Sequence, residues 1–470
     1  MNIPDWVKDS VFYQIFPDRF ANGDPTNDPP NVQGWGQPPD PIHFQGGDLA
    51  GIEQRLDYLQ DLGVNAIYLN PIFLSPSTHR YNTVDYYRID PKLGTLEEFR
   101  KLVKAVHQRG MRIILDGVFN HCGRGFFAFN DLLENGKDSP YLNWFHVHRF
   151  PLNAYSRGKA VNYEAWWGFK SLPKFNTSNP NVRQYILDVA RYWIEEGVDG
   201  WRLDVPNEID DDQFWAEFRE VVKSANPHAY LVGEIWDVWP RWVNDAHFDG
   251  VMHYPLRAAI LDVLRGGITA ADFTSRLQQI EQAYGRDALF GMYLLLGSHD
   301  TERVKTLLNG NLEKLKLAYL LLFAFPGTPS IYYGDEIGLE GGKDPDCRRA
   351  FPWDESQWDH ELRNWIKGLI NARHNTPVLR RGSWTSEPYH QNNGTIRIIR
   401  EGGGEELHIF VNLAQETARV YIPAGKSNPH ATQPPRDLLG GSAIIERVQE
   451  NWQITLPPLS GGYYSVRRLS

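Results

Sequence analysis

The 470-residue sequence contains only two cysteines, Cys122 and Cys347, which excludes a disulfide framework and leaves a single bridge open. It has no uninterrupted apolar run of about 18 residues, so we expect no membrane-spanning helix. Its first residues, MNIPDWVKDSVFYQIF, lack the basic start and the long apolar stretch of a secretory signal. These absences predict a cytoplasmic protein that has no membrane partner.

Basic residues are outnumbered, with 48 Lys and Arg against 58 Asp and Glu and a net charge of −10. Binding to nucleic acid requires clustered Lys and Arg that neutralise phosphates, and no such basic run occurs. No Gly-x-Gly-x-x-Gly motif follows the first apolar run, which disfavours a dinucleotide-binding fold. We therefore expect no nucleic-acid partner and no organic cofactor, whereas the oligomeric state stays open.

Aromatic residues are abundant, with 16 Trp, 22 Tyr and 23 Phe. Large rings fill a large hydrophobic core, and they also stack on the apolar C–H faces of sugar rings. Composition favours the core interpretation and does not separate the two.

Eight short runs rich in β-branched and aromatic residues recur along the chain, each followed by a segment with helical spacing. Runs that are apolar on both faces are typical of parallel strands buried on both sides. Eight strand–helix units predict an α/β fold that closes into a (β/α)₈ TIM barrel. The runs are 11–16, 66–70, 112–118, 200–204, 230–235, 250–254, 292–298 and 330–334. The clearest helical segments are 48–62, 96–109 and 183–196, followed by Gly63, Gly110 and Gly197 as expected helix ends.

Two stretches depart from this alternation. Residues 122–176 are too long for a structureless loop and predict a subdomain inserted after the third strand. From residue 378 to 470 short strands alternate with Gly- and Pro-containing turns, which predicts a C-terminal β-sandwich domain. Residues 1–121 and 177–377 would then form the barrel.

Charged and polar residues follow four of the predicted barrel strands. A single acid after a strand is often only a helix cap, but caps need not all be charged and fall on one rim. Barrel enzymes place their catalytic groups at this rim. The residues are Asp116, Asn120, His121, Arg202, Asp204, Glu234, His299 and Asp300.

Paired carboxylates on neighbouring strands suit cleavage of a glycosidic bond. A retaining enzyme needs two carboxyls about 5 Å apart. Asp204 and Glu234 end the fourth and fifth strands, and adjacent strands lie roughly 4.8 Å apart. Arg202, two residues before Asp204, would point to the same side, and its charge is expected to keep Asp204 ionised.

Oxygen-bearing side chains gather in NGDPTND (22–28) and QGGD (45–48). Hard oxygen ligands on a flexible loop suit Ca²⁺, although the same residue types also form ordinary turns. The candidate ligands are Asn22, Asp24, Asn27, Asp28, Gly46 and Asp48. The residues alone leave both interpretations open.

Seven segments strongly resemble motifs of the α-amylase family of glycoside hydrolases, and along the chain they occur in the order found in that family. The resemblance covers nearly the whole chain. The segments are DGVFNH (116–121), GWRLDVPNE (200–208), GEIW (233–236), GSHD (297–300), GVNAIYLNPIF (63–73), LPKFN (172–176) and GTPSIYYGDEIGL (327–339). The resemblance implies that Asp204 is the nucleophile and Glu234 the general acid/base. It implies that Asp300 binds sugar hydroxyls and distorts the ring.

The same resemblance implies a shell of substrate-binding residues. Tyr81, His121, Arg202 and His299 would surround the reacting glucose, and Trp236 of GEIW would also contact substrate. Asn207, Glu208 and LPKFN resemble the neopullulanase, cyclomaltodextrinase and maltogenic amylase group, which implies contacts to the leaving-group sugar. Asp344 and Arg348 would hold the non-reducing end. The group often binds calcium at a matching loop, which favours the calcium interpretation.

Some features depart from that group. The first strand is expected at residue 11, so we expect the group's extra N-terminal β domain to be absent and the cleft to be more open. Arg80 and Asn82 flank Tyr81 where Lys and Asp are usual, and Asp237 replaces a His after GEIW. Trp166 and Trp167 precede LPKFN and either line the cleft or pack within the subdomain.

The resemblance thus implies a retaining hydrolase of α-1,4 and/or α-1,6 glucosidic bonds in maltooligosaccharides, cyclodextrins, pullulan or branched glucans, with some glycosyl transfer. One alternative is a debranching enzyme that mainly cleaves α-1,6 branches. The other is a non-catalytic carbohydrate-binding or transport-associated homologue, against which the three acids argue.

Overall fold

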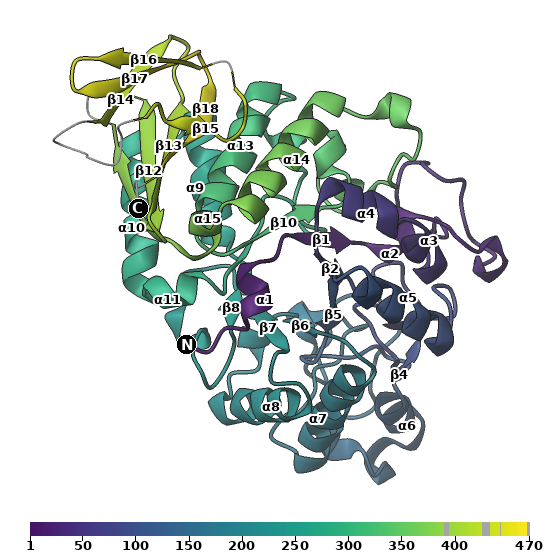
Figure 1. The fold of residues 1–470 in the computed structure, drawn as a ribbon. Coiled ribbons are helices and arrows are strands. Elements are labelled where there is room, and N and C mark those ends of the chain that lie inside the picture. Colours follow the sequence, from purple (N-terminus) through teal and green to yellow (C-terminus); the bar gives the residue numbers. More distant parts are fainter. Residues whose placement is uncertain (390–393, 425–432, 442, 468–470) are drawn as a thin grey trace.

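The computed structural model describes residues 1–389, 394–424, 433–441 and 443–467, and an eight-stranded parallel sheet lies at its centre (Figure 1). Its strand order is β8-β7-β6-β5-β2-β1-β10-β9, and a parallel bridge between Met252 and Tyr293 joins the two ends. The predicted (β/α)₈ barrel is therefore confirmed. The strands are β1 (Phe12–Ile15), β2 (Ala66–Leu69), β5 (Arg112–Gly117), β6 (Gly200–Leu203), β7 (Tyr230–Gly233), β8 (Gly250–Val251), β9 (Tyr293–Leu294) and β10 (Thr328–Tyr332).

Helices surround this sheet. They are α1 (Asp5–Lys8), α2 (Pro17–Phe20), α3 (Leu49–Gln54), α4 (Leu56–Leu62), α5 (Leu96–Gln108), α7 (Pro180–Glu195), α8 (Asp212–Ala225), α9 (Tyr254–Arg265), α10 (Ala270–Tyr284), α11 (Arg286–Leu289), α12 (Val304–Leu307), α13 (Leu312–Ala324), α14 (His360–Asn375) and α15 (Pro377–Arg381). Long helices such as α5, α7 and α8 each turn an apolar face towards the core. None of the helices in the described part of the chain could cross a membrane.

The helix expected at 48–62 is instead two helices, α3 and α4, which meet at Arg55. The Arg55 backbone leaves the helical range (φ −104°, ψ 9°), and its N–H donates to Ile52 three residues back. Its guanidinium lies 3.9 Å from the centre of the Trp353 ring. The glycines expected to end helices, Gly63, Gly110 and Gly197, all adopt positive φ (94°, 70° and 99°), as helix termination by glycine requires.

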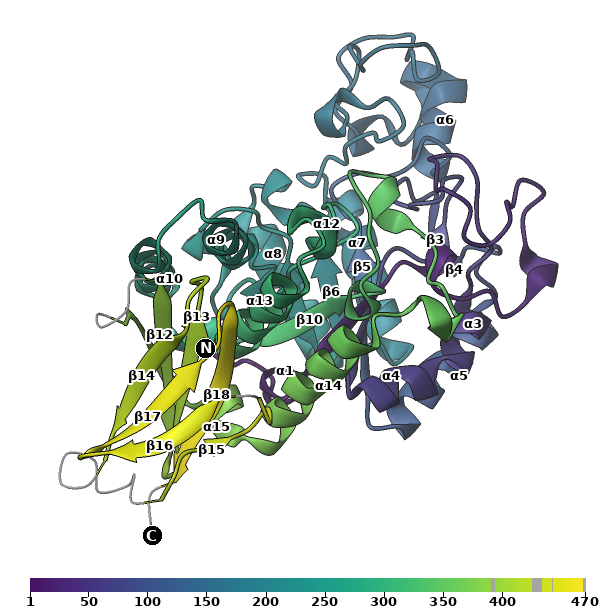
Figure 2. The same ribbon diagram turned by 90° about the horizontal axis from the view of Figure 1, so that it is seen from above.

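Residues 122–176 carry one helix, α6 (Phe127–Asn135), and three short 3₁₀ turns, η2 (Gly136–Asp138), η3 (Leu142–Trp144) and η4 (Trp166–Gly168). Isolated antiparallel bridges such as Phe145–Phe175 and Val147–Tyr163 fold the segment back on itself. Nearby, β3 (Phe73–Leu74) pairs with β4 (Asp85–Ile89). Figure 2 shows the insertion projecting from the barrel on the side away from the C-terminal sheets.

The C-terminal region is all-β, as predicted, and packs against α10 and α13 (Figure 1). One sheet has the order β11-β12-β13-β18-β15 and the other β14-β17-β16. Phe410, Val420, Ile454 and Tyr464 fill the space between them. The strands are β11 (Ser383–Pro388), β12 (Thr395–Gly402), β13 (Glu405–Asn412), β14 (Ala418–Pro423), β15 (Arg436–Asp437), β16 (Ile444–Val448), β17 (Asn451–Leu456) and β18 (Ser460–Arg467).

Closure of the barrel depends on two glycines at the β8–β9 seam. A Cβ on Gly250 would lie 1.8 Å from the Gly291 carbonyl oxygen, and a Cβ on Gly291 would lie 2.0 Å from that of Asp249. The two backbones approach this closely only because neither residue has a side chain. The seam then allows Met252 to pair with Tyr293.

Gly250→Ala should lower the free energy of unfolding by about 1–3 kcal/mol, because the added methyl group forces the seam apart. Urea denaturation measures this change. Gly368→Ala in α14 is the matched control, since its methyl group would meet no atom within 4 Å. The control should gain roughly 0.5–1 kcal/mol through helix propensity. Equal stability of Gly250→Ala and the unsubstituted protein would contradict the proposed role of the seam.

Candidate active site

A single buried guanidinium, that of Arg202, joins carboxylates from three neighbouring strands. Its Nη1 lies 2.8 Å from Asp116 Oδ1 and 3.0 Å from Asp204 Oδ1, and its Nη2 lies 3.0 Å from Glu234 Oε2. In the sheet register Arg202 lies beside Asp116 of β5 and Val232 of β7. The parallel strands therefore bring these groups together at their carboxyl ends.

The residue after Asp204 has an unusual backbone. Val205 adopts φ 36° and ψ 50°, a left-handed conformation that is rare for a β-branched residue. This turn directs the Val205 N–H at Glu234 Oε2, 3.1 Å away, while the Trp236 indole N–H donates to Glu234 Oε1 at 3.1 Å. Both oxygens of Glu234 are thus held in place.

Asp300 lies in a second charged group, opposite the first. His299 Nε2 is 3.0 Å from its Oδ2 and Arg348 Nη2 is 3.3 Å from its Oδ1. The other nitrogen of Arg348, Nη1, lies 2.9 Å from Asp344, so one arginine joins two acids. The Asp300 side chain remains 32% exposed, which makes it accessible to a ligand.

Tyr81 connects the two charged groups. Its hydroxyl is 2.7 Å from Asp116 Oδ2 and 2.6 Å from His299 Nε2. Its ring stacks on the His299 imidazole with centroids 5.3 Å apart and planes 6° from parallel. Tyr81 therefore fixes the distance between the carboxylates on Arg202 and the Asp300 pair.

The acids differ in the direction of their pKa shifts. Burial raises the pKa of Asp204 well above its usual range, Arg202 opposes this, and Glu234 and Asp116 add to it. Arg202 lowers the pKa of Asp204, in the direction that the sequence analysis expects, but burial and the neighbouring acids outweigh its charge, so the pKa is raised overall. Partial desolvation raises the pKa of Asp300, but the charges of His299 and Arg348 outweigh it and lower that pKa.

His121, buried within the same region, is neutral because burial lowers its pKa to about 3. Its Nδ1 contacts the Asn120 amide at 3.1 Å, while its Nε2 has no hydrogen-bond partner among the described residues. Its ring stacks on Trp166 at 5.6 Å. A buried ring nitrogen without a partner can bind a ligand hydroxyl.

Glu208 and Asn207 follow the Val205 turn in η5 (Pro206–Glu208) and are half-buried. Lys174 of LPKFN donates to the Glu208 carbonyl at 2.9 Å, and its Nζ lies 3.8 Å from the Glu208 carboxylate. Trp236 stacks on Tyr254 with centroids 3.7 Å apart and is 47% exposed. Lys174 and Glu208 line one cavity together with residues of the inserted segment, including Trp166 and Trp167.

Several residues that the sequence did not single out support this site. Tyr68 donates to Asp116 at 2.5 Å, Asn70 donates to the Tyr81 hydroxyl at 3.0 Å, and the Gln14 amide lies 2.9 Å from His299 Nδ1. Gln14 and Asn70 stand out as polar residues within or at the end of the apolar runs of β1 and β2. That contrast is the signal by which sequence could have found them. Asp116, whose place on the rim the sequence predicts, accepts from Tyr68 and Tyr81 and pairs with Arg202.

The candidate calcium ligands gather around Asp48, whose carboxylate accepts from Gly23, Asp24 and Gly51 backbone N–H groups. Asn22 donates to both oxygens of Asp28 at 3.0 and 3.1 Å. The side-chain oxygens of Asn22 and Asn27 are buried and have no partner among the described residues. These two oxygens fit a hard cation.

Two of the six candidate ligands, Asp24 and Gly46, differ from the others in their surroundings. The Asp24 carboxylate is used by Thr26, which donates through its N–H and hydroxyl at 3.0 and 2.6 Å. A Cβ on Gly46 (φ 85°) would lie 2.2 Å from Asp28 Oδ1, so only glycine fits beside this carboxylate. Burial raises the pKa of Asp28, and Asp48 adds to that shift. A cation would relieve this repulsion.

Comparison with known proteins agrees with this geometry. The family described as "Alpha amylase, catalytic domain" matches residues 14–389, and the chain belongs to this family. It is 43% identical to a cyclomaltodextrinase from Geobacillus thermopakistaniensis, over 98% of this chain and 78% of that protein. It is also 43% identical to neopullulanase 2 from Thermoactinomyces vulgaris, over 97% of this chain and 78% of that protein.

Solved structures match along the whole chain. A cyclic α-maltosyl-(1→6)-maltose hydrolase from Arthrobacter globiformis superimposes with a TM-score of 0.90 at 42% identity, covering 99% of this chain and 100% of that one. A debranching enzyme from Nostoc punctiforme gives a TM-score of 0.88 at 41% identity, covering 98% and 99%.

The opposite pKa shifts predict opposite effects on stability. The raised pKa of Asp204 means that ionising it costs folded-state free energy, so stability falls as pH rises above the usual Asp pKa. Asp204→Asn should therefore raise Tm at neutral pH. Asp300, with a lowered pKa, contributes stability above its unfolded pKa that is lost on acidification, so Asp300→Asn should lower Tm.

Thermal unfolding of both variants at neutral pH and at about pH 4 checks this prediction, since the unfolded Asp pKa is about 3.9. The difference for Asp204→Asn should shrink at the lower pH, whereas that for Asp300→Asn should largely persist, because the lowered pKa of Asp300 means that its stabilisation is lost only below the unfolded Asp pKa. Shifts of the same sign in the two variants would contradict the assigned pKa directions.

Proposed function

We propose that this protein hydrolyses α-glucosidic bonds in maltooligosaccharides and related glucans, with retention of anomeric configuration. The observation that carries the proposal is the Arg202 guanidinium contacting both Asp204 and Glu234 in a member of the α-amylase family. All three acids are present, which argues against a non-catalytic homologue.

In this proposal Asp204 attacks the anomeric carbon while Glu234 gives its proton to the leaving glycosidic oxygen. The first bond made is Asp204 Oδ to the sugar carbon, and the bond broken is that carbon to the leaving oxygen. Glu234, now ionised, takes a proton from water, whose oxygen displaces Asp204. A sugar hydroxyl in place of that water gives glycosyl transfer.

The two carboxyls need one proton between them, and the charge distribution favours that state. Once one of them ionises, its charge disfavours ionisation of the other, because both lie against one buried arginine. Arg202 balances the remaining negative charge. Asp300, exposed and ionised beside His299 and Arg348, would accept hydrogen bonds from hydroxyls of the reacting sugar.

Asp204→Asn should abolish nearly all turnover, by at least about 10³-fold, while substrate still binds. Product release from maltoheptaose measures turnover, and calorimetric titration measures binding. The unsubstituted protein should show a bell-shaped rate profile whose acidic limb lies above the usual Asp pKa, because the raised pKa of Asp204 delays its ionisation. Substantial turnover by Asp204→Asn would overturn the proposed role of Asp204.

The bond type is proposed to include both α-1,4 and α-1,6 links. Relatives named cyclomaltodextrinase and neopullulanase support action on more than one kind of α-glucan. A second candidate is cleavage mainly of α-1,6 branches. It is favoured by the two solved structures that match end to end, whose names refer to a (1→6) link and to debranching. Relative rates on cyclodextrin, pullulan and linear or branched maltooligosaccharides decide between them, since negligible α-1,6 cleavage eliminates the second.

We also propose that Asn22, Asn27, Asp28 and Asp48 hold a calcium ion. It would tie residues 22–28 to residues 46–48 and take no part in bond cleavage. Saturating calcium, at roughly 100 times its Kd, should add about 2.7 kcal/mol to the free energy of unfolding, and a chelator should remove it.

Thermal unfolding with and without chelator measures the calcium effect. Asp28→Ala should lose it, whereas Asp57→Ala, which removes a largely exposed acid from α4, should keep it. An unchanged Tm after chelation of the unsubstituted protein would contradict the site.

We propose an intracellular location from similarity to one relative. The chain is 44% identical to a protein from Bacillus subtilis named intracellular maltogenic amylase, over 79% of this chain and 62% of that one.

A further inference from the structure

Three aromatic residues of the inserted segment lie on the side of the proposed active site, and two of their side chains are exposed. Trp167 is 69% exposed and Phe169 is 53% exposed, whereas Trp166 is half-buried. Large apolar side chains exposed together mark a binding surface more often than isolated ones do. The rings come from η4 and the residue after it.

These rings form one continuous stack with the active site. His121 stacks on Trp166 at 5.6 Å and 27°, and Trp166 stacks on Trp167 at 4.8 Å and 10°. Phe169 stacks on Trp166 at 6.0 Å and 30°. Trp166 therefore covers part of Trp167, whose side chain nonetheless stays largely exposed.

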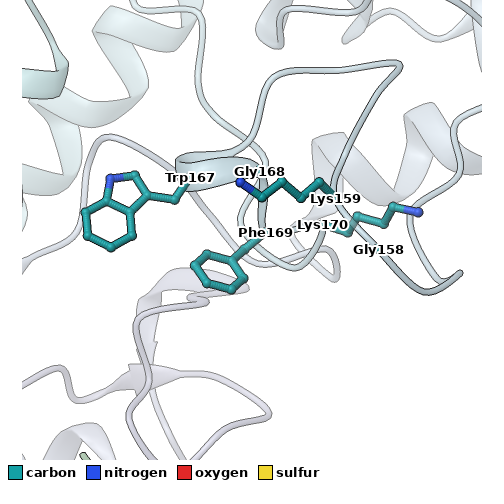
Figure 3. Close-up of a pocket in the computed structure, with 6 residues that line it drawn as sticks. All are labelled: Gly158, Lys159, Trp167, Gly168, Phe169 and Lys170. Atoms are coloured by element: carbon teal, nitrogen blue, oxygen red, sulfur yellow. The ribbon is translucent and has the colours of Figure 1, made fainter.

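The surface next to this stack is hollowed. A cavity of about 650 Å³ is lined by Gly158, Lys159, Trp167, Gly168, Phe169 and Lys170, and Figure 3 shows the rings of Trp167 and Phe169 projecting from one turn. A second cavity of about 320 Å³ shares Trp167 and Gly168 and reaches Lys174 and Glu208. The hollows connect the exposed rings with the residues that follow Asp204.

Two further observations indicate a ligand rather than packing. Trp167 adopts φ 49°, an unfavourable backbone conformation that keeps its indole outside the core. The buried Trp166 indole N–H and His121 Nε2 both lack a hydrogen-bond partner among the described residues. A ligand with many hydroxyl groups would satisfy both atoms.

We propose that Trp166, Trp167 and Phe169 form an extended binding surface for glucose units of the α-glucan substrate beyond the leaving-group sugar. This inference rests on the proposed function. The C–H faces of successive glucose units would stack on Trp167 and Phe169, while hydroxyls reach Trp166 and the Lys174–Glu208 pair. Short substrates would not extend to this surface, whereas longer or branched glucans would.

The test compares kcat/KM on maltoheptaose with kcat/KM on maltotriose. Trp167→Ala should lower this ratio about three- to tenfold, as loss of one aromatic stacking contact predicts. Trp167→Phe keeps a ring and should restore most of the ratio. Tyr155→Ala is the matched control, because Tyr155 is 70% exposed in the same segment but contacts Arg124 instead. An unchanged ratio in Trp167→Ala would overturn the proposal.

A binding measurement separates this proposal from the proposed function. Maltoheptaose is titrated into Asp204→Asn and into Asp204→Asn/Trp167→Ala. Affinity about three- to tenfold weaker in the double variant supports the surface, and equal affinity overturns it. Absence of turnover in the unsubstituted protein would overturn the proposed function, while these titrations would still decide whether the surface binds glucan.

Discussion

One buried guanidinium, that of Arg202, holds carboxylates from three neighbouring strands, and the geometry of the active face depends on this contact. Each of Asp116, Asp204 and Glu234 would pay a large desolvation cost if buried alone. Arg202 offsets part of that cost for all three. Without this cation, three buried acids would face one another with no compensating charge. The barrel strands and the guanidinium therefore together stabilise the arrangement of Asp116, Asp204 and Glu234.

Three carboxyl groups contact a single guanidinium, so the site contains more acidic groups than Arg202 can neutralise. Burial raises the pKa of Asp204, and the charges of Glu234 and Asp116 add to the shift that Arg202 opposes. A site of this kind retains a proton that can be passed to a leaving group. Asp300 lies outside the three-acid group, pairs with His299 and Arg348, and stays ionised. Tyr81 contacts both groups and holds them at a fixed separation.

Three residues that border the site, Arg80, Val205 and Trp167, adopt left-handed backbone conformations (φ 61°, 36° and 49°). Val205 turns away from β6 in a left-handed conformation and presents its N–H to Glu234, and Trp167 adopts a similar conformation in the insertion. Such conformations cost about 1–3 kcal/mol and persist only where surrounding contacts fix them. The rigid barrel supplies those contacts for Val205. The insertion, which projects from the barrel, supplies an aromatic surface on which substrate length can be sensed.

The sequence by itself determined the eight barrel strands, the all-β C-terminal region and the rim positions of the acids, because burial on both faces leaves a local apolar pattern. It also marked Asn22, Asp28 and Asp48 as candidate ligands. It did not show that the helix at 48–62 breaks at Arg55, or that Gln14 contacts His299 and Asn70 contacts Tyr81. Nor did it determine the pKa of Asp204 or the His121–Trp166–Trp167 stack. Those features depend on distances between residues far apart in the chain and on how much water reaches them, and only the closed barrel and its folded insertion decide both.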